Sequence, residues 1–147
     1  PSGEPVLDWT IPKEWSIRDA YVADQSGKRI IDFQQSNLHV VNYSAPVRTR
    51  LPLSELRKRI HTLPAQPDVV PYRTSYYRED WGFCAAHRVV EPLPEGEYEA
   101  VIDSSLTDGV LSYGECVLPG TTSREILFSA HCCHPSMAND NLSAVVV

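Results

Sequence analysis

The sequence predicts an α+β fold that is mostly β, with a β-rich domain over residues 1–108 and the first strands of an α/β layer over residues 109–147. Two observations predict this division. Before residue 109, short stretches of alternating apolar and polar residues are separated by Pro, Gly and Asn, which is typical of strands and turns. Near the C-terminal end, the apolar run at residues 125–130 is typical of a strand buried on both faces, and a polar loop follows it.

The first elements follow from hydrophobic periodicity. Residues 15–22 alternate large apolar and polar side chains, residues 25–28 have turn chemistry, and residues 29–33 resume the extended pattern. This arrangement predicts a β-hairpin. Residues 37–41 are a further strand candidate.

The clearest helix is expected at residues 52–61. Leu53, Leu56 and Ile60 recur at helical spacing, and Pro52 stands near the start, where its missing N–H costs nothing. Three prolines within residues 62–73 then predict an irregular connection.

Two long strands are expected after this connection. Residues 97–103 and 110–118 both have strand character, and a turn at residues 107–109 joins them. We therefore expect these two segments to form an antiparallel pair.

Composition restricts the function classes. The 147 residues carry 13 Lys+Arg against 19 Asp+Glu, a net charge of −6, without a dense basic stripe, so nucleic acid is not expected as a partner. The apolar runs are far shorter than the ~20 residues that cross a bilayer, so no membrane span is expected. Two of the four cysteines, Cys132 and Cys133, are adjacent and suit a disulfide framework poorly, which favours reduced thiols and a cytoplasmic location.

Both ends of the chain look cut. Residue 1 is Pro1 instead of Met, and the sequence stops within the apolar residues 144–147. We therefore expect the chain to be a fragment of a longer protein.

The densest group of chemically active side chains lies after the apolar run at residues 125–130. It contains two imidazoles, two thiols and one carboxylate within ten residues: His131, Cys132, Cys133, His134 and Asp140. Neutral imidazole and carboxylate are ligands of hydrolytic zinc, which lowers the pKa of a bound water. Without a metal, a strand-end histidine and an aspartate near a helix N-terminus would be the simpler interpretation.

Three segments resemble the metal-binding opening of the di-zinc exopeptidases, the superfamily of bacterial leucyl aminopeptidases: residues 113–120, 126–131 and 134–143. Five further segments resemble prokaryotic aminopeptidase-like proteins in which a β-rich domain of unknown function is inserted into the peptidase domain: residues 6–15, 17–21, 61–64, 74–77 and 81–84. The resemblance covers nearly the whole chain. It implies that residues 1–108 are the inserted accessory domain and that residues 109–147 begin a zinc aminopeptidase-like domain.

The resemblance also implies roles for individual residues. His131 would bind one zinc, and Asp140 would bridge two zinc ions. The superfamily pattern His-x-Asp has Cys133 in place of the aspartate that orients the imidazole, so Cys133 or His134 would support the ring or serve as an alternative ligand. The remaining ligands and the general-base glutamate are expected beyond Val147, so we expect this chain alone to be inactive.

Other residues leave alternatives open. Cys84 and His87 have zinc-like spacing and could complete a closed site with the cluster at residues 131–134, although buried packing is the default for a cysteine. The aromatic stretch at residues 72–83 could wall a substrate pocket, with Tyr76, Tyr77 and Trp81 as the candidates: Tyr, Trp and Arg dominate binding hot spots. It could equally form the core of the domain.

The resemblance implies that the intact protein is a zinc-dependent aminopeptidase-like hydrolase acting on a peptide or peptide-like small substrate. In this reading the β-rich domain shapes substrate access. The alternative is a binding or oligomerisation module of a catalytically inactive aminopeptidase-like protein, and a homo-oligomer is left open as a partner.

Overall fold

The computed structural model describes residues 1–130. The chain divides into two compact units, Pro1–Val110 and Leu111–Val147. All helices and strands of the described residues lie in the first unit, which is mostly β with short helices. The prediction of an α+β, mostly β fold is therefore confirmed. The assignment of residues 109–147 to a separate peptidase-type domain stays a prediction.

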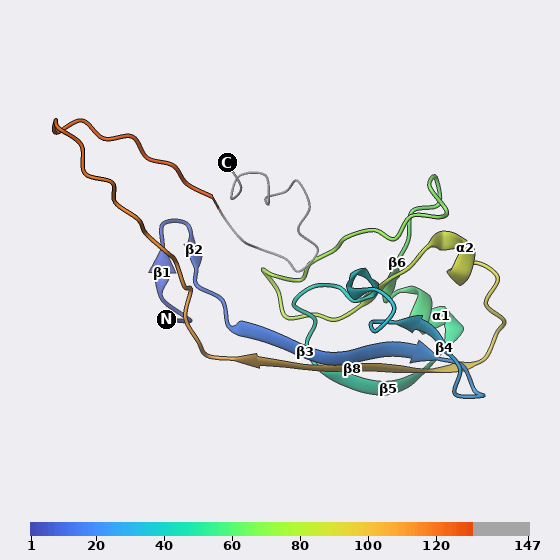
Figure 1. Ribbon diagram of the computed structural model, residues 1–147. Coiled ribbons are helices and arrows are strands. Elements are labelled where there is room, and N and C mark those ends of the chain that lie inside the picture. The colour runs from blue at the N-terminus through green and yellow to red at the C-terminus, as the bar shows by residue number, and fades with distance from the viewer. Residues whose placement is uncertain (131–147) are drawn as a thin grey trace. The chain divides into compact units, whose positions relative to one another are not determined.

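The first unit is built on a four-stranded antiparallel sheet. Its strands stand in the order β4 (Arg29–Asp32), β3 (Glu14–Ala23), β8 (Glu97–Thr107) and β5 (Val47–Pro52) (Figure 1). Strands β3 and β4 form the hairpin that the sequence predicts, and Gly27 in its turn takes the left-handed φ of +83° that glycine tolerates.

A β-bulge at Arg18 keeps the apolar side chains of β3 on one face. Ile17 pairs with Ser104 and Asp19 pairs with Asp103, so Arg18 is the extra residue of the longer strand. Trp15 and Ile17 before the bulge, and Ala20 and Val22 after it, therefore all face the core. Without the bulge, half of β3 would turn its apolar side chains to water.

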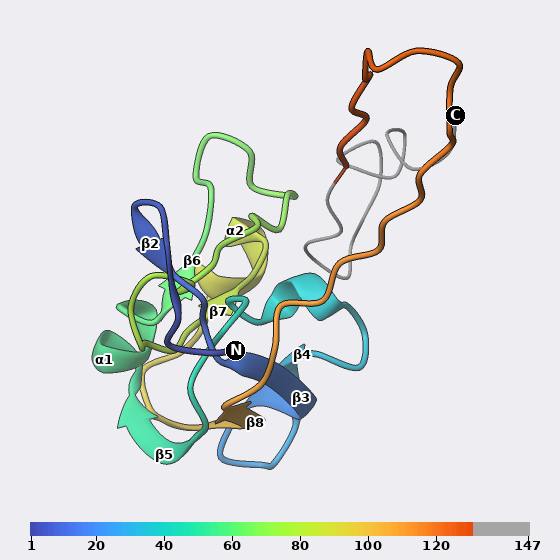
Figure 2. The same ribbon diagram turned by 90° about the vertical axis from the view of Figure 1, so that its left-hand side faces the viewer.

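Most of the remaining elements and loops cover one face of the sheet, above it in Figure 1 and in the turned view of Figure 2. These elements are the 3₁₀ helix η1 (Asn37–His39), α1 (Leu53–Arg57), β6 (Ile60–His61), β7 (Phe83–Cys84) and α2 (His87–Val90). The short strands β1 (Pro5–Val6) and β2 (Trp9–Thr10) lie beyond the N-terminal end of β3 in Figure 1. Strand β1 pairs with β2, and β6 pairs with β7 in parallel.

The core lies between this layer and the sheet. Its buried residues come from both sides: Ala20, Val22, Ile31, Val40, Leu53, Leu56, Ile60, Phe83, Ala85, Val90, Tyr98, Ala100 and Ile102. Since the sheet and the covering layer each contribute apolar side chains, the first unit has a hydrophobic core of its own.

Two predicted elements near the core take other forms. The strand expected at residues 37–41 is wrong: the backbone forms η1, whose first turn Ser36 caps by accepting from the Leu38 N–H at 3.3 Å. The helix expected at residues 52–61 begins where predicted but ends at Arg57, because the chain then turns to pair β6 with β7. Leu53, Leu56 and Ile60 are all buried nonetheless.

The strand pair expected from residues 97–103 and 110–118 is wrong. Strand β8 has β3 on one side and β5 on the other, so both of its hydrogen-bonding edges are taken. The described residues from 111 to 130 contain no strand, including the run at 125–130 that was expected to be buried on both faces. There, Ile126, Leu127 and Phe128 are 84–90% exposed.

Candidate functional site

Five aromatic rings from distant parts of the sequence form a continuous cluster in the first unit. We call Trp9, Trp15, Tyr43, Tyr76 and Tyr77 the ring cluster. The Tyr43 ring stacks on Trp15 with centroids 5.9 Å apart and meets Tyr76 edge-on at 4.8 Å. Tyr76 also contacts Tyr77 edge-on at 5.1 Å and Trp9 at 6.4 Å. Such offset and edge geometries are favourable for aromatic pairs.

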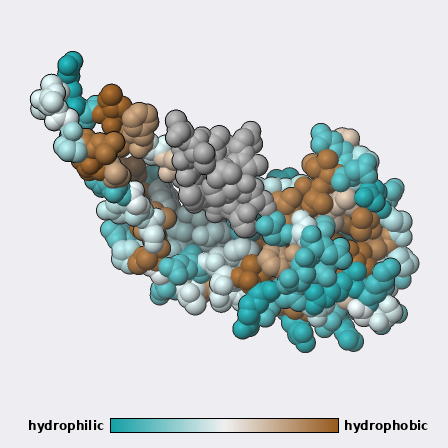
Figure 3. All heavy atoms as spheres, in the orientation of Figure 1, coloured by the Kyte–Doolittle hydropathy of each residue, from teal (hydrophilic) through white to brown (hydrophobic). Residues whose placement is uncertain are grey.

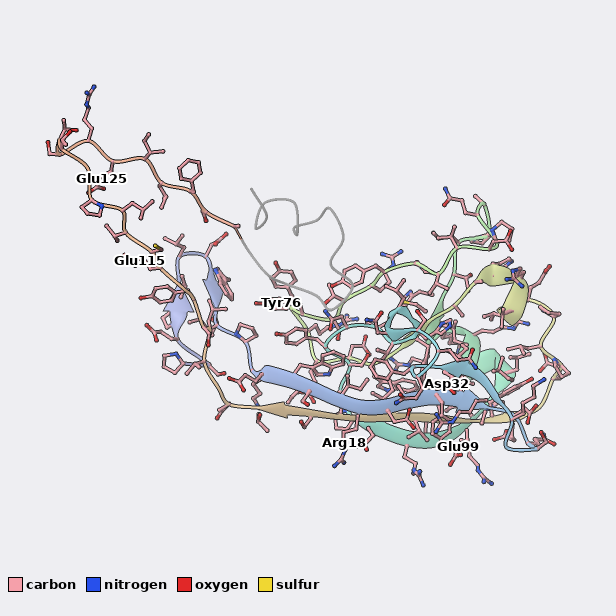
Figure 4. All side chains as sticks on the ribbon, viewed as in Figure 1. Arg18, Asp32, Tyr76, Glu99, Glu115 and Glu125 are labelled. Carbon is pink, nitrogen blue, oxygen red and sulfur yellow. The ribbon has the colours of Figure 1, made fainter. Side chains whose placement is uncertain are left out.

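The rings of the cluster differ in their exposure to solvent. Tyr77 is 89% exposed, whereas Tyr76 and Tyr43 are half-buried. Figure 4 shows Tyr76 on the face of the sheet opposite to Arg18 and Glu99. The cluster therefore lies on the covered side of the sheet, where Trp15 comes from β3, Trp9 comes from β2 and the three tyrosines come from loops.

Burial further favours the neutral form of the inner phenols. The pKa of Tyr43 is raised, mainly by burial and then by the negative charge of Glu14. The pKa of Tyr76 is raised for the same first reason and by Tyr43 beside it. Both hydroxyl groups can therefore donate a hydrogen bond at neutral pH.

The backbone at Tyr43 is strained. Its φ is +66°, a left-handed conformation that is a genuine outlier for a bulky side chain. Such conformations cost about 1–3 kcal/mol and persist where the surrounding structure fixes them, often at functional sites.

Hydrogen bonds on both sides of Tyr43 fix this conformation. The Asn42 N–H donates to the Arg73 carbonyl and the Ser75 N–H donates to the Asn42 carbonyl, both at 2.9 Å. On the other side, the Ser44 carbonyl accepts from Trp15 Nε1 at 2.9 Å and from the Ser104 hydroxyl at 2.8 Å. The loop is thus tied both to the segment that carries Tyr76 and to the sheet.

An ionic group follows the cluster along the chain. Asp80 accepts from Arg59 at 2.6 Å and from Arg78 at 2.9 Å. The Trp81 N–H also donates to this carboxylate, and these hydrogen bonds hold the pKa of Asp80 below its usual value. The Arg59 guanidinium lies 4.7 Å from the centre of the Trp81 ring.

The structure separates the three predicted pocket-wall residues. Tyr76 and Tyr77 belong to the ring cluster. Trp81 packs against the core instead and meets Phe83 edge-on at 6.4 Å. Tyr76 and Tyr77 therefore suit the pocket-wall interpretation of the aromatic stretch, whereas Trp81 suits the core interpretation.

The predicted metal residues His131, Cys133, His134 and Asp140 lie outside the described residues, and their roles stay predictions. Among residues 1–130, no group of three or more His, Cys, Asp or Glu side chains could hold a metal ion. The Nδ1 atom of His87 lies 3.1 Å from the Thr62 hydroxyl. Cys84 is buried, and burial raises the pKa of its thiol to about 11.

The outer face of the sheet is hollowed. An open hollow of about 500 Å³ has a mixed lining of Asp19, Tyr21, Arg29, Pro46, Val47, Arg48, Val101, Ile102 and Asp103. Three charged residues of this lining have ionic partners. Arg29 binds Asp19 at 2.7 Å and also binds Asp32, and Asp103 binds Arg18 at 2.8 Å. Figure 3 shows hydrophilic residues over the lower edge of this unit, where the sheet lies.

Sequence reasoning missed three members of the ring cluster: Trp9, Trp15 and Tyr43. Trp15 carried a signal, because it stands at a core-facing position of a predicted strand. Tyr43 carried no such signal, because its ring contacts Trp15 and Tyr76, which are each more than 25 residues away in the sequence.

Taken together, the fold defines a mostly β domain that presents aromatic side chains on the layer covering its sheet. Residues 14–105 match the family described as "Domain of unknown function (DUF2172)", and the chain belongs to this family.

Two comparisons connect the chain to longer proteins of Clostridium acetobutylicum. It is 51% identical over 146 residues to a protein named "Putative polysaccharide biosynthesis protein with aminopeptidase-like domain". It also matches a crystal structure titled as that of a "putative peptidase", with 51% identity and a TM-score of 0.91. The matches cover 99% and 98% of this chain but 34% of each relative, so the chain spans about a third of their length. Among the described residues, no helix has the length and apolar character that crossing a bilayer requires.

Proposed function

We propose that this chain is part of a zinc-dependent, aminopeptidase-like hydrolase in which the DUF2172 domain shapes access of the substrate. The names of both relatives support the peptidase class, and the motif resemblance around His131 and Asp140 supports the metal. The substrate in this proposal is a peptide or a peptide-like small molecule with a free amino end. Free thiols at Cys84 and Cys116 suit a cytoplasmic protein.

The observation that carries the accessory role is the ring cluster. A wall that selects substrates needs side chains that are exposed yet held in place. Tyr77 is exposed, and Tyr76 beneath it is held by Tyr43 and Trp9. None of these rings is a nucleophile or a carboxylate base, so their part would be to bind and orient the substrate.

The chemistry of the donor set suits zinc. His131 and Asp140 would hold the metal, because imidazole nitrogen and carboxylate oxygen are the ligands that hydrolytic zinc sites use. Bound zinc would supply an activated water and polarise the carbonyl group of the substrate. Cys133 or His134 would orient the His131 ring, as groups next to a ligating histidine commonly do.

Substrate selectivity of the full-length protein tests the proposal. We expect Tyr76→Ala or Tyr77→Ala to change the ratio of kcat/KM between two aminoacyl substrates by about tenfold or more, because binding differences set discrimination. His131→Ala or Asp140→Ala should lower turnover by more than about 100-fold and weaken zinc binding.

Tyr76→Phe is the matched control, because it keeps the ring and should keep the ratio. An unchanged ratio in the two alanine variants would show that the rings only pack. If the unmodified full-length protein shows no zinc-dependent turnover, the alternative of a binding or oligomerisation module in an inactive protein is favoured.

A further inference from the structure

Strand β5 forms one edge of the four-stranded sheet, because the strand order ends with it (Figure 2). The Leu53 N–H donates to the Gly96 carbonyl at 3.0 Å, and this pair continues the register between β5 and β8. In an antiparallel ladder only every second residue exchanges hydrogen bonds with the neighbouring strand. Counting back from Leu53, the N–H and C=O groups of Arg48 and Arg50 therefore point away from β8, toward the free edge.

These backbone groups at the edge have little else to bond. Among the residues that the structure describes, the contact made to them is that of the Thr49 hydroxyl with the Arg50 carbonyl, and it is long at 3.5 Å. Pro52 has no N–H and closes this stretch of the edge. An extended peptide can bond to such an edge as a further strand.

The side chains of the same two arginines lie on the outer face of the sheet. Arg48 lines the hollow of that face, and both arginines are exposed. Within residues 1–130 neither forms an ion pair, whereas Arg18 and Arg29 on the same face are paired with aspartates. The edge of β5 therefore presents two positive charges beside its free backbone groups.

Most carboxylates near the edge have partners of their own. The acidic residues of β8 on the outer face are Glu97, Glu99 and Asp103. Arg18 holds both oxygens of Asp103, with bonds of 2.9 and 2.8 Å. In α1, which follows β5, Glu55 is bound by Lys58 at 2.7 Å.

The acidic residues of β8 also lie one strand further in than the arginines. Arg50 stands opposite Glu99 in the register between the two strands. Neighbouring strands are about 4.8 Å apart, so a strand added at the edge would lie about 10 Å from β8. Its side chains on the outer face would meet Arg48 and Arg50 first.

These charges restrict what can pair with the edge. Antiparallel pairing of two β5 edges would place Arg48 of one copy opposite Arg50 of the other, and like charges opposite each other are destabilising. Acidic side chains at the same positions would be attracted. On the inner side, Val47 and Leu51 are half-buried and pack against the core, so apolar side chains fit there.

We propose that the free edge of β5 is a docking site for an extended peptide segment in which acidic and apolar side chains alternate. The segment bonds to the backbone of Arg48 and Arg50, its carboxylates lie beside their guanidinium groups, and its apolar side chains continue the inner face of the edge. This inference does not depend on the proposed hydrolase. Charged edge residues can also serve only to keep copies of a protein from pairing, and the experiment separates the two roles.

Peptide binding to the 147-residue chain tests the docking site. The probe is an acetylated, amidated pentapeptide that alternates valine and glutamate, and its matched control has lysine in place of each glutamate. We expect the acidic peptide to bind at least about tenfold more tightly, because opposite charges across a strand pair attract and like charges repel. Amide hydrogen exchange followed by NMR should slow at Arg48 and Arg50, whose N–H groups become bonded.

A third peptide separates strand addition from simple charge attraction. It has the acidic sequence with N-methyl groups on both glutamates, whose N–H groups face the edge when their side chains lie beside the arginines. The charge is kept but the hydrogen bonds are lost, so this peptide should bind about tenfold more weakly. Equal binding of the methylated and unmethylated acidic peptides would overturn the proposal. Equally effective competition by inorganic triphosphate would do the same, because it would show anion binding without strand addition.

Variants of the two arginines test their role directly. Arg48→Gln combined with Arg50→Gln should reduce the preference for the acidic over the lysine peptide to less than about twofold. The control is Arg88→Gln combined with Arg124→Gln, which removes the same charge outside the sheet and should keep the preference. All four arginines are exposed, so the urea midpoints should stay close to that of the parent chain.

Two results with these reagents would contradict the docking site. One is equal binding of the acidic and lysine peptides to the parent chain. The other is a preference that survives in the folded Arg48→Gln and Arg50→Gln double variant. In either case the arginines of β5 would serve only to keep edges of different copies apart.

Discussion

Cys84 shows how strongly burial controls one residue. Its side chain lies in the core beside β6, and burial raises the pKa of the thiol to about 11. The thiolate is the reactive form, so the fraction available at pH 8 is much smaller than for an ordinary cysteine of pKa ~8.5. Cys116, by contrast, is exposed.

We therefore expect iodoacetamide at pH 8 to modify Cys84 at least about 100-fold more slowly than Cys116 in the native protein. Peptide mass mapping at timed intervals measures both rates in one sample. In urea the two rates should converge, since unfolding removes the burial. Rapid modification of Cys84 in the native state would show that β7 opens readily.

At the scale of elements, β7 depends on the glycine before it. A Cβ at Gly82 would lie 2.9 Å from the Arg59 carbonyl oxygen and 3.2 Å from Val41 Cγ2. That same carbonyl accepts from the Phe83 N–H at 2.8 Å, so it has little freedom to move. The close approach of two backbones is what permits β6 and β7 to pair.

Gly82→Ala should accordingly destabilise the protein by about 1–3 kcal/mol through overpacking. The measurement is the urea midpoint at constant m-value. Gly114→Ala is the control, because an added Cβ there meets nothing within 4 Å and should change stability by less than about 0.5 kcal/mol. Equal midpoints for the two variants would mean that the backbone at Gly82 relaxes freely.

On the scale of the whole molecule, we expect the first unit to fold without a metal. Its core joins the sheet to the covering layer, and within residues 1–130 no group of metal-ligating side chains takes part. A domain of this size can be held by its core alone.

Thermal melting with and without a strong chelator checks this expectation. The two curves should agree within about 2 °C, because structural zinc would otherwise contribute folding free energy directly. A large drop in Tm would instead favour the closed site that combines Cys84 and His87 with the cluster at residues 131–134. A Cys84→Ser variant would then lose its sensitivity to the chelator.

Local patterns predicted the parts of the fold that depend on local physics. The hairpin of β3 and β4 follows from alternation around a turn, and the start of α1 follows from Pro52. The end of α1 was predicted incorrectly because pairing between β6 and β7, more than 20 residues apart, competes with helix extension. The candidate site was predicted only in part. The aromatic composition of residues 72–83 indicated Tyr76 and Tyr77, but nothing indicated that Trp9, Trp15 and Tyr43 complete the cluster.

The sequence by itself determined the mostly β class, the individual strands of the hairpin, and the family resemblance around His131 and Asp140. Only the tertiary structure decided that β8 lies between β3 and β5, and that Tyr43 joins Trp15 to Tyr76. The physical reason is the separation along the sequence over which each interaction acts. Turn chemistry and periodicity act over a few residues, whereas strand order and ring contacts depend on which distant segments bury their apolar faces together.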